Sequence, residues 1–371
     1  MNKPKVLILT DWFVPGYKAG GPITSIFNMI SSLNGDVNFS LFTRNTDWFD
    51  NTPFDLMPDQ WLDKYRSKVY YSSRNHLKGA FKSLSMKVDV LYINGFYSPL
   101  FNSIPLIFVL LFKRSLKVIL APRGMLNQNA IAIKVKQKRL LIDLLGFLGI
   151  EKKVIFHATS MKEKEAILYV YPKANIRIAS NLTATPSQVE HRVSKSSFSF
   201  LSVGRISAVK NTLELVEMFS QLNKLQLKLV GTEDDEDYFE KCSSVIKASP
   251  NIESRGGRNA EEIKLDYQKA DFFISMTSGE NFGHAIIEAL SFGCPVIISD
   301  QTPWNDLEEF GAGWVIPLDD KSRWNKVLSE AIVLSDSDYM EMSQKARAYL
   351  KTRFNFEEIR SNYLELFSAK G

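Results

Sequence analysis

Two acidic residues, Glu280 and Glu288, flank a run whose residue types suit the binding of an anionic group. The run begins directly after Glu280 with Asn281, Phe282, Gly283 and His284. At the start of a helix, such residues present backbone N–H groups that have no partner within the helix, and these groups bind phosphate. A carboxylate on either side adds acceptors for hydroxyl groups. The pattern predicts a site for a phosphorylated polyol, although the spacing alone also allows Glu280 to cap the helix and Glu288 to be solvated.

Two basic residues form a second candidate site. Gly204-Arg205 follows an apolar run at 198–203, and Lys210-Asn211 stands where the next helix is expected to begin. Cations at a helix N-terminus neutralise a leaving group that gains negative charge, so Arg205 and Lys210 are candidates to hold a diphosphate. The alternative is that both are ordinary solvated surface charges.

Both sites belong to strand–loop–helix units, and these units predict the fold. In residues 271–300 an apolar run is followed by a polar loop, a helix with an apolar face, a helix-ending Gly293 and a second apolar run. Further short strands are expected at 5–10, 38–43, 88–93, 117–121, 154–159, 176–180, 225–231 and 251–255. Strands that alternate with helices predict an α/β fold with doubly wound parallel sheets, in which ligands bind at the carboxyl ends of the strands.

The chain is long enough for two such domains. Apolar order fades over 181–197 and then restarts, which marks a linker. We expect an N-terminal domain at 1–182 and a C-terminal domain at 183–355. Residues 44–87 mix aromatics, proline and aspartate without a steady period, and irregular structure is expected there.

Glycines stand at three further strand ends or helix starts. Gly20-Gly21 precedes an apolar helical stripe, where it allows the backbone to approach a phosphate or sugar closely, or simply makes a tight turn. Gly231 ends the expected strand at 225–231, and Gly256 follows the one at 251–255.

The segment SGENFGHAIIEALSFGCPVIISD closely resembles the signature of the family 4 (group 1) glycosyltransferases. This is a large retaining group with the GT-B fold, in which two Rossmann-like domains face each other across a cleft. The resemblance implies metal-independent transfer from a nucleotide-sugar donor. It places Arg205 and Lys210 on the diphosphate, Glu288 on the ribose and Glu280 on the donor sugar near the reacting carbon. It also implies that the nucleotide base lies near Gly256.

The resemblance is looser in the first domain. Many members carry a histidine where this chain has Arg123, in a run, APRGM, that resembles enzymes of bacterial surface-polysaccharide assembly. Assistance to the departing phosphate is therefore open between Arg123 and His157, and a histidine at a strand end is also commonly structural. The last helix, 356–371, resembles the family's closing helix, which packs back on the first domain.

Composition limits the other partners. The two cysteines and four histidines are scattered, so no metal or other cofactor is expected, and the setting is expected to be cytoplasmic. No nucleic-acid-binding motif is present. Residues 1–183 hold 25 Lys/Arg and 12 Asp/Glu, whereas residues 184–371 hold 21 and 29, so the first half favours an anionic partner.

One basic stretch predicts contact with an anionic membrane surface. From Lys113 to Lys153 the sequence has ten basic residues and two acids, and 131–148 combines a basic side with an apolar side, as an amphipathic helix does. Each Lys or Arg near an anionic bilayer contributes about 1 kcal/mol. We expect peripheral association with the inner face of the membrane, where a lipid-linked or oligosaccharide acceptor can enter the site. The alternative is a core-packing helix with a solvated face.

Two other functions share these motifs. A nucleotide-sugar epimerase or hydrolase of the same fold would act on the donor without transferring it to an acceptor. A catalytically silent partner subunit would only bind the donor, but Glu280, Glu288, Arg205 and Lys210 are all present, which argues against silence. The motifs leave the sugar, the nucleotide and the acceptor unnamed.

Overall fold

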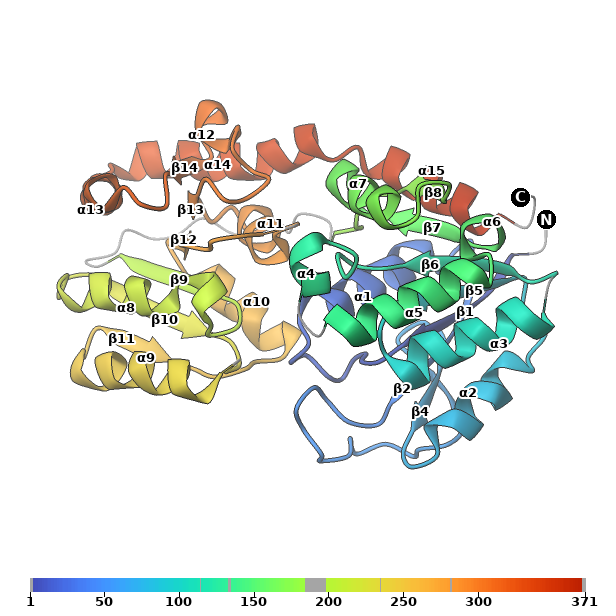
Figure 1. Ribbon diagram of the computed structural model, residues 1–371. Coiled ribbons are helices and arrows are strands. Elements are labelled where there is room, and N and C mark those ends of the chain that lie inside the picture. The colour runs from blue at the N-terminus through green and yellow to red at the C-terminus, as the bar shows by residue number, and fades with distance from the viewer. Residues whose placement is uncertain are drawn as a thin grey trace. The chain divides into compact units, whose positions relative to one another are not determined.

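The computed structural model describes residues 3–113, 115–132, 135–183, 198–233, 235–280 and 282–368. It divides into two compact units (Figure 1). Unit 1 is Met1–Leu182 with Phe356–Gly371, and unit 2 is Thr183–Asn355. Each unit is a largely or wholly parallel sheet covered by helices. The expected doubly wound α/β architecture is confirmed in both units.

The described residues of unit 1 form an eight-stranded sheet in the order β3-β4-β2-β1-β5-β6-β7-β8. All neighbours pair in parallel except β3 and β4. The central strands are continuous apolar runs because helices cover both faces of the sheet; every residue of β5 is buried. The strands are β1 (Lys5–Thr10), β2 (Asn38–Arg44), β3 (Trp61–Lys64), β4 (Ser67–Ser72), β5 (Val90–Asn94), β6 (Lys117–Ala121), β7 (Ile155–Ala158) and β8 (Asn175–Ile178).

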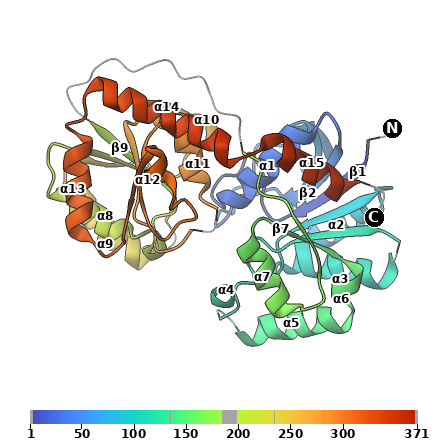
Figure 2. The same ribbon diagram turned by 90° about the horizontal axis from the view of Figure 1, so that it is seen from above.

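Helices of unit 1 lie on both sides of this sheet (Figure 2). On one side, α1 buries Ile23, Ile26 and Ile30 at helical spacing, and Pro22 occupies its first turn. On the other side, apolar residues of α2, α3, α5 and α7 join the core under the sheet. The helices are α1 (Gly21–Leu33), α2 (His76–Leu84), a π-helical turn η1 (Pro99–Ser103), α3 (Ile104–Phe112), α4 (Gln128–Ala132), α5 (Val135–Phe147), α6 (Ile150–Lys153), α7 (Met161–Val170) and α15 (Phe356–Phe367).

The expectation of irregular structure at 44–87 is wrong for the second half of that segment, which contains β3, β4 and α2. The two strands form a hairpin whose two loop residues, Tyr65 and Arg66, both have positive φ, +52° and +59°. Such a turn is normally marked by asparagine and glycine. Tyrosine and arginine give no turn signal, so the hairpin was hidden in the sequence.

The last helix, α15, belongs to unit 1 although it is far from the rest of that unit in sequence. Arg360 of α15 forms an ion pair with Asp36, and Phe367 packs edge-to-face on Phe39 with 5.8 Å between ring centroids. Lys117 donates to the carbonyl oxygen of Ser368 at 2.9 Å. These contacts fasten the end of the chain to strands β2 and β6 and to the turn after α1.

Unit 2 has a six-stranded parallel sheet in its described residues, in the order β11-β10-β9-β12-β13-β14. Its strands are β9 (Ser199–Val203), β10 (Gln226–Val230), β11 (Ile252–Ser254), β12 (Phe272–Ser275), β13 (Val296–Ser299) and β14 (Gly313–Ile316). Its helices are a 3₁₀ turn η2 (Ala208–Lys210), α8 (Thr212–Ser220), α9 (Glu236–Ala248), α10 (Ala260–Lys269), α11 (His284–Ser291), α12 (Leu307–Phe310), α13 (Lys321–Ala331) and α14 (Asp336–Arg353). The order reverses at β9, so the loops after β9 and β12 meet at a switch point, where ligands bind in such sheets.

Candidate active site

The start of α11 is held in place by a glycine and a tryptophan. Gly283 is the N-cap residue with φ +80°, and a Cβ atom added there would lie 2.7 Å from Nε1 of Trp304. Trp304 Nε1 donates to the carbonyl oxygen of Phe282 at 2.9 Å. The ring of Phe282 packs on His284, with centroids 4.7 Å apart. The helix end predicted to bind phosphate is therefore braced by its own unit; Asn281 lies outside the described residues.

Glu280 and Lys210 form an ion pair where the loop between β9 and α8 meets the loop between β12 and α11. Lys210 Nζ lies 2.7 Å from Glu280 Oε2, and both side chains are about one quarter exposed. Burial acts to raise the pKa of Glu280, but the Lys210 ammonium and the backbone N–H groups of Phe282 and Gly283 outweigh it and hold that pKa below its ordinary value. Glu280 is thus a carboxylate at neutral pH, paired with a cation.

Two loops far apart in sequence are tied together to make this pair. The carbonyl oxygen of Val209, in η2, accepts hydrogen bonds from Ser278 N at 2.8 Å and Thr277 Oγ1 at 3.1 Å. Asn211, with φ +48°, caps α8 and donates from Nδ2 to the carbonyl oxygen of Met276 at 2.9 Å. Lys210 is therefore held beside the β12–α11 loop by its neighbours on both sides.

A small cavity opens at the carboxyl ends of β9, β10 and β12. Arg205 is exposed at its edge, directly after β9. The lining residues are Ser202, Val203, Gly204, Arg205, Ile206, Lys210, Thr212, Leu229, Val230 and Ser275. The two cations predicted to hold a diphosphate thus line one cavity, with Glu280 bonded to one of them.

Glycines let three backbone segments come together beneath this cavity. A Cβ atom on Gly231 would lie 1.7 Å from the carbonyl oxygen of Gly204, so no other residue fits there. Gly231 N donates to the carbonyl oxygen of Gly256 at 2.9 Å, and Gly204 N donates to that of Val230 at 2.9 Å. Gly256 itself has φ +64°, and nothing lies within 4 Å of the position that a Cβ atom would take. Glycine at 231 follows from close packing, whereas glycine at 256 follows from backbone conformation.

Glu288 lies one turn inside α11 in a different environment from Glu280. Burial raises the pKa of Glu288 to about 7, against the lowering effect of its hydrogen bond with the Tyr267 hydroxyl. Tyr267, on α10, is buried, and its hydroxyl oxygen lies 3.0 Å from the carbonyl oxygen of Ala285, so its single proton is shared between that carbonyl and Glu288. Glu288 therefore carries a proton for part of the time near neutral pH, while Glu280 does not.

In unit 1, Arg123 and His157 belong to one buried hydrogen-bond chain. The ring of His157 is fully buried; its Nε2 donates to the carbonyl oxygen of Ala179 at 2.8 Å, and its Nδ1 accepts from the Tyr92 hydroxyl at 2.8 Å. The Tyr92 oxygen in turn accepts from Arg123 Nη2 at 2.9 Å. Burial, assisted by the Arg123 charge, lowers the pKa of His157 to about 3. These contacts favour the structural alternative for His157, because both ring nitrogens are occupied inside unit 1.

The Arg123 guanidinium is held from several strands. Nε donates to Asn94 Oδ1 and Nη1 to Asn181 Oδ1, both at 2.7 Å. The residue has φ +55°, and the next residue, Gly124, donates its N–H to the buried carboxylate of Glu163 at 2.7 Å. Arg123 is thus fixed at the carboxyl edge of the unit 1 sheet. Gly20, with φ +66°, caps α1 ahead of Gly21 at the same edge, and nothing lies within 4 Å of the position of its Cβ.

Comparison with solved structures identifies this arrangement. HepE of Anabaena in complex with UDP-glucose is similar over 99% of this chain and 100% of that one, with a TM-score of 0.73 and 16% sequence identity. The chain has the GT-B fold. Each unit described above is one of its two Rossmann-like domains.

Sequence comparison relates the second GT-B domain to a family. Residues 183–349 match the family model described as "Glycosyl transferases group 1". The lipopolysaccharide core biosynthesis glycosyltransferase LpsE of Rhizobium meliloti is 24% identical over 204 residues, 53% of this chain and 59% of that protein. A GDP-mannose:cellobiosyl-diphosphopolyprenol alpha-mannosyltransferase of Xanthomonas oryzae is 22% identical over 215 residues, 56% of each chain. The matched regions thus span little more than half the length of these curated relatives.

Several residues that shape the candidate sites of the two units gave no signal in the sequence. Tyr267 lies on a helix of ordinary amphipathic pattern, and Trp304 stands in the loop after β13, where nothing marks it as a brace. Asn94 is the last residue of β5, and Asn181 follows β8. Polar residues directly after buried strands were the available clue, because the carboxyl ends of parallel strands share one edge.

Proposed function

We propose that this protein is a retaining, metal-independent glycosyltransferase that moves a sugar from a nucleoside-diphosphate donor to a glycan acceptor. The observation that carries the proposal is the cavity at the ends of β9, β10 and β12, with Arg205 and Lys210 on it and Glu280 bonded to Lys210. A nucleoside-diphosphate leaving group gains negative charge as the sugar departs, and fixed cations stabilise that charge. Two cations in this position supply what a metal ion would supply in a metal-dependent enzyme.

The residues have separate parts in this proposal. Arg205 and Lys210 hold the diphosphate, and the N–H groups at the start of α11 bind its oxygens or the sugar hydroxyls. An ammonium has three N–H donors, so Lys210 can bind a phosphate oxygen and still retain Glu280. Glu280 contacts the donor sugar near the reacting carbon, and Glu288 accepts from the ribose hydroxyls. Gly204, Gly231 and Gly256 let the nucleotide approach the backbone.

The acceptor we propose is a lipid-linked glycan of surface-polysaccharide assembly, including O-antigen, capsule or exopolysaccharide. Two relatives support this choice by their names, which refer to lipopolysaccharide core biosynthesis and to a diphosphopolyprenol acceptor. The charge of the first half of the sequence also suits an anionic lipid surface. Within the described ranges, no helix combines the length and the apolar character needed to cross a membrane.

Helix α5 is the proposed point of contact with the inner face of the membrane. One of its sides packs in the core through Leu145, which is fully buried. Its other side exposes Leu140 by 72%, Leu144 by 43% and Phe147 by 88%, a stripe at helical spacing, with Lys136 and Arg139 also exposed. A stripe of exposed apolar and basic side chains is the pattern of a helix that lies on a membrane surface. Arg114, Ile133 and Lys134 of the predicted basic stretch lie outside the described residues.

A donor screen followed by product analysis tests the reaction. Thermal stabilisation by UDP-, GDP- and dTDP-sugars identifies the donor, because a ligand that binds only the folded state raises the melting temperature. NMR of the transferred sugar is expected to give the same anomeric configuration as in the donor, and activity is expected to survive EDTA. Inverted product would remove the retaining assignment, and loss of activity that divalent metal restores would remove the metal-independent one.

A further inference from the structure

A loop of unit 1 carries exposed aromatic rings on an unusually well-fixed backbone. This loop, residues 45–54, follows β2 and is named here the Trp48 loop. Thr46 and Pro53 form an antiparallel bridge across it, and Phe54 N donates to the carbonyl oxygen of Asn45 at 2.9 Å. The loop is therefore closed at its base, with Trp48 and Phe49 beyond the bridge.

Acidic residues anchor the Trp48 loop to the segment after β1. The Asp47 carboxylate accepts the backbone N–H groups of Tyr17 at 2.8 Å, Lys18 at 3.1 Å and Trp48 at 2.7 Å. Asp50 Oδ2 lies 2.6 Å from Lys18 Nζ. Three of these contacts tie the loop to Tyr17 and Lys18, and the two aspartates that make them stand on either side of the aromatic pair in sequence.

Trp12 and the two aromatic rings of this loop pack in a row whose outer end is exposed to solvent. Arg44 lies over the Trp12 ring, with 5.6 Å to its centroid, and Trp12 meets Trp48 edge-to-face at 6.3 Å. Phe49 packs on Trp48 at 4.6 Å with an interplanar angle of 32°. The outermost ring, Phe49, is 82% exposed and sits on a backbone with φ +49°. A bulky non-glycine residue with a positive φ costs of order 1 kcal/mol or more. Because the Phe49 ring is exposed, burial of the ring offsets little of that cost.

We propose that the exposed face of Phe49, backed by Trp48, is a stacking subsite for a neutral pyranose of the acceptor glycan. This proposal rests on the glycosyltransferase function proposed above. The axial C–H bonds of a pyranose carry slight positive charge, and the face of an aromatic ring carries slight negative charge, so the two stack. Asp50, the next residue after Phe49, is paired with Lys18 and has a partly exposed side chain, so its carboxylate can still accept a sugar hydroxyl.

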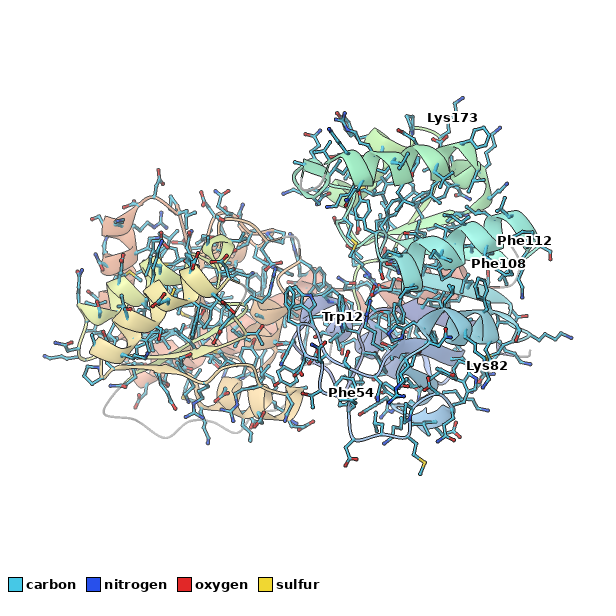
Figure 3. All side chains as sticks on the ribbon, turned by 60° about the horizontal axis from the view of Figure 1, so that its bottom comes forward. Trp12, Phe54, Lys82, Phe108, Phe112 and Lys173 are labelled. Atoms are coloured by element: carbon cyan, nitrogen blue, oxygen red, sulfur yellow. The ribbon has the colours of Figure 1, made fainter. Side chains whose placement is uncertain are left out.

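The charges near the loop favour a neutral glycan over an anionic membrane surface as its partner. Residues 45–63 contain five aspartates and no lysine or arginine, and the nearby cations Lys18 and Arg44 are paired with Asp50 and Asp11. The loop therefore has no excess of positive charge to attract anionic lipid, and it suits an uncharged polyol. The loop is also remote from the aromatic residues of α3: in Figure 3, Trp12 and Phe54 lie at one end of unit 1, and Phe108 and Phe112 lie at the opposite end. A neutral glycan is the occupant that this charge pattern favours.

Saturation-transfer NMR with simple sugars tests the subsite directly. The probes are methyl glycosides of glucose, galactose, mannose, rhamnose and N-acetylglucosamine, at concentrations of tens of millimolar. The variants of the full chain are Phe49→Ala, Phe49→Leu and Phe49→Tyr, with Phe112→Ala as a matched loss of an exposed phenylalanine (71% exposed). Phe49→Leu retains apolar area but removes the aromatic face.

At least one glycoside is expected to bind, about three- to tenfold more weakly to Phe49→Ala and Phe49→Leu than to wild type. Phe49→Tyr and Phe112→Ala are expected to bind like wild type. No binding of any glycoside, or equal binding to wild type and Phe49→Leu, overturns the proposal. Thermal stabilisation by the donor is measured in parallel: it is expected to be unchanged in all four variants, and its absence from wild type would count against the donor site and not against this loop.

Discussion

Lys210 is paired with Glu280 and is proposed to bind the donor diphosphate with the same side chain. In the structure its ammonium is balanced by Glu280 at 2.7 Å, and neither group is fully buried. A surface ion pair of this kind contributes little to stability, because water screens the attraction and both side chains lose freedom. Its value is positional: the pair keeps a carboxylate and a cation together at the strand ends before any donor arrives.

Lys210→Ala is expected to lower kcat/KM by about two orders of magnitude or more, because it removes a cation that stabilises leaving-group charge. Arg205→Ala is expected to behave similarly. The control is Lys247→Ala, which removes an exposed lysine of α9 and is expected to leave the rate unchanged. Steady-state kinetics with the donor found by thermal screening measures all three. Near-normal turnover in both Arg205→Ala and Lys210→Ala would show that the cations do not hold the diphosphate.

Glu288 predicts a pH dependence of stability. Its pKa is about 7 in the folded chain and about 4.3 in an unfolded chain. Between these values the folded state retains a proton that the unfolded state has released, so the free energy of unfolding falls as the pH rises through this range. Glu288→Gln removes that effect and is expected to be more stable than wild type at pH 8, by on the order of 1–3 kcal/mol, with a smaller gain at pH 5.

Urea unfolding of wild type and Glu288→Gln at pH 5 and pH 8 measures this difference. The same variant is expected to bind the free nucleoside diphosphate more weakly by calorimetry, whereas Glu280→Gln is expected chiefly to slow the chemical step. A stability difference that does not change between the two pH values would contradict the environment assigned to Glu288. Equal loss of nucleotide affinity in both variants would contradict the division of roles.

At the scale of elements, the site depends on how closely two strand ends approach. The loops after β9 and β10 touch through Gly204 and Gly231, and there is no room for a side chain at 231. Gly279, in the β12–α11 loop, has nothing within 4 Å of its Cβ position and no positive φ. An alanine is therefore expected to destabilise the fold at position 231 and to be tolerated at position 279.

Gly231→Ala is expected to destabilise unit 2 by several kcal/mol or to prevent its folding, since the added methyl group would overlap backbone. Gly279→Ala is expected to change the free energy of unfolding by less than about 0.5 kcal/mol. Gly256→Ala should fall between them, at roughly 1 kcal/mol, because only its positive φ opposes a side chain. Circular dichroism melts order the three variants, and a Gly231→Ala melt like that of wild type would refute the close approach.

At the scale of the molecule, basic charge is concentrated in the first half of the sequence and acidic charge in the second. Flotation with vesicles containing anionic lipid tests the proposed contact through α5. Wild type is expected to float at low salt and to be released as salt screens the attraction. Lys136→Gln with Arg139→Gln, and separately Phe147→Ala, should each reduce flotation without changing donor affinity.

The matched control removes the same charge elsewhere: Lys241→Gln with Lys247→Gln, both exposed on α9 of unit 2. If that pair reduces flotation as much as the α5 pair, net charge and not this helix governs binding. If wild type does not float at low salt, the membrane contact is wrong and the acceptor is delivered in another way.

Most of the elements, and the strand ends at which chemistry was expected, could be read from local sequence patterns. Apolar runs and helical spacing are local properties, so the strands around Glu280 and Arg205, the helix from Gly21 to Leu33 and the last helix from Phe356 to Phe367 could all be placed from them. The hairpin at 61–72 could not, because its turn uses Tyr65 and Arg66 in conformations that these residues seldom adopt.

Which of those residues lie together depends on how the strands pair, and this appears first in the folded chain. Lys210 and Glu280 are 70 positions apart and meet because β9 and β12 are neighbours in the sheet, a pairing that no local pattern encodes. The same holds for His157, whose bonds to Tyr92 and Ala179 bury it among other strands. It also holds for the unequal pKa values of Glu280 and Glu288, because a carboxyl group's charge depends on the cations, hydroxyls and burial around it, and sequence spacing determines none of these.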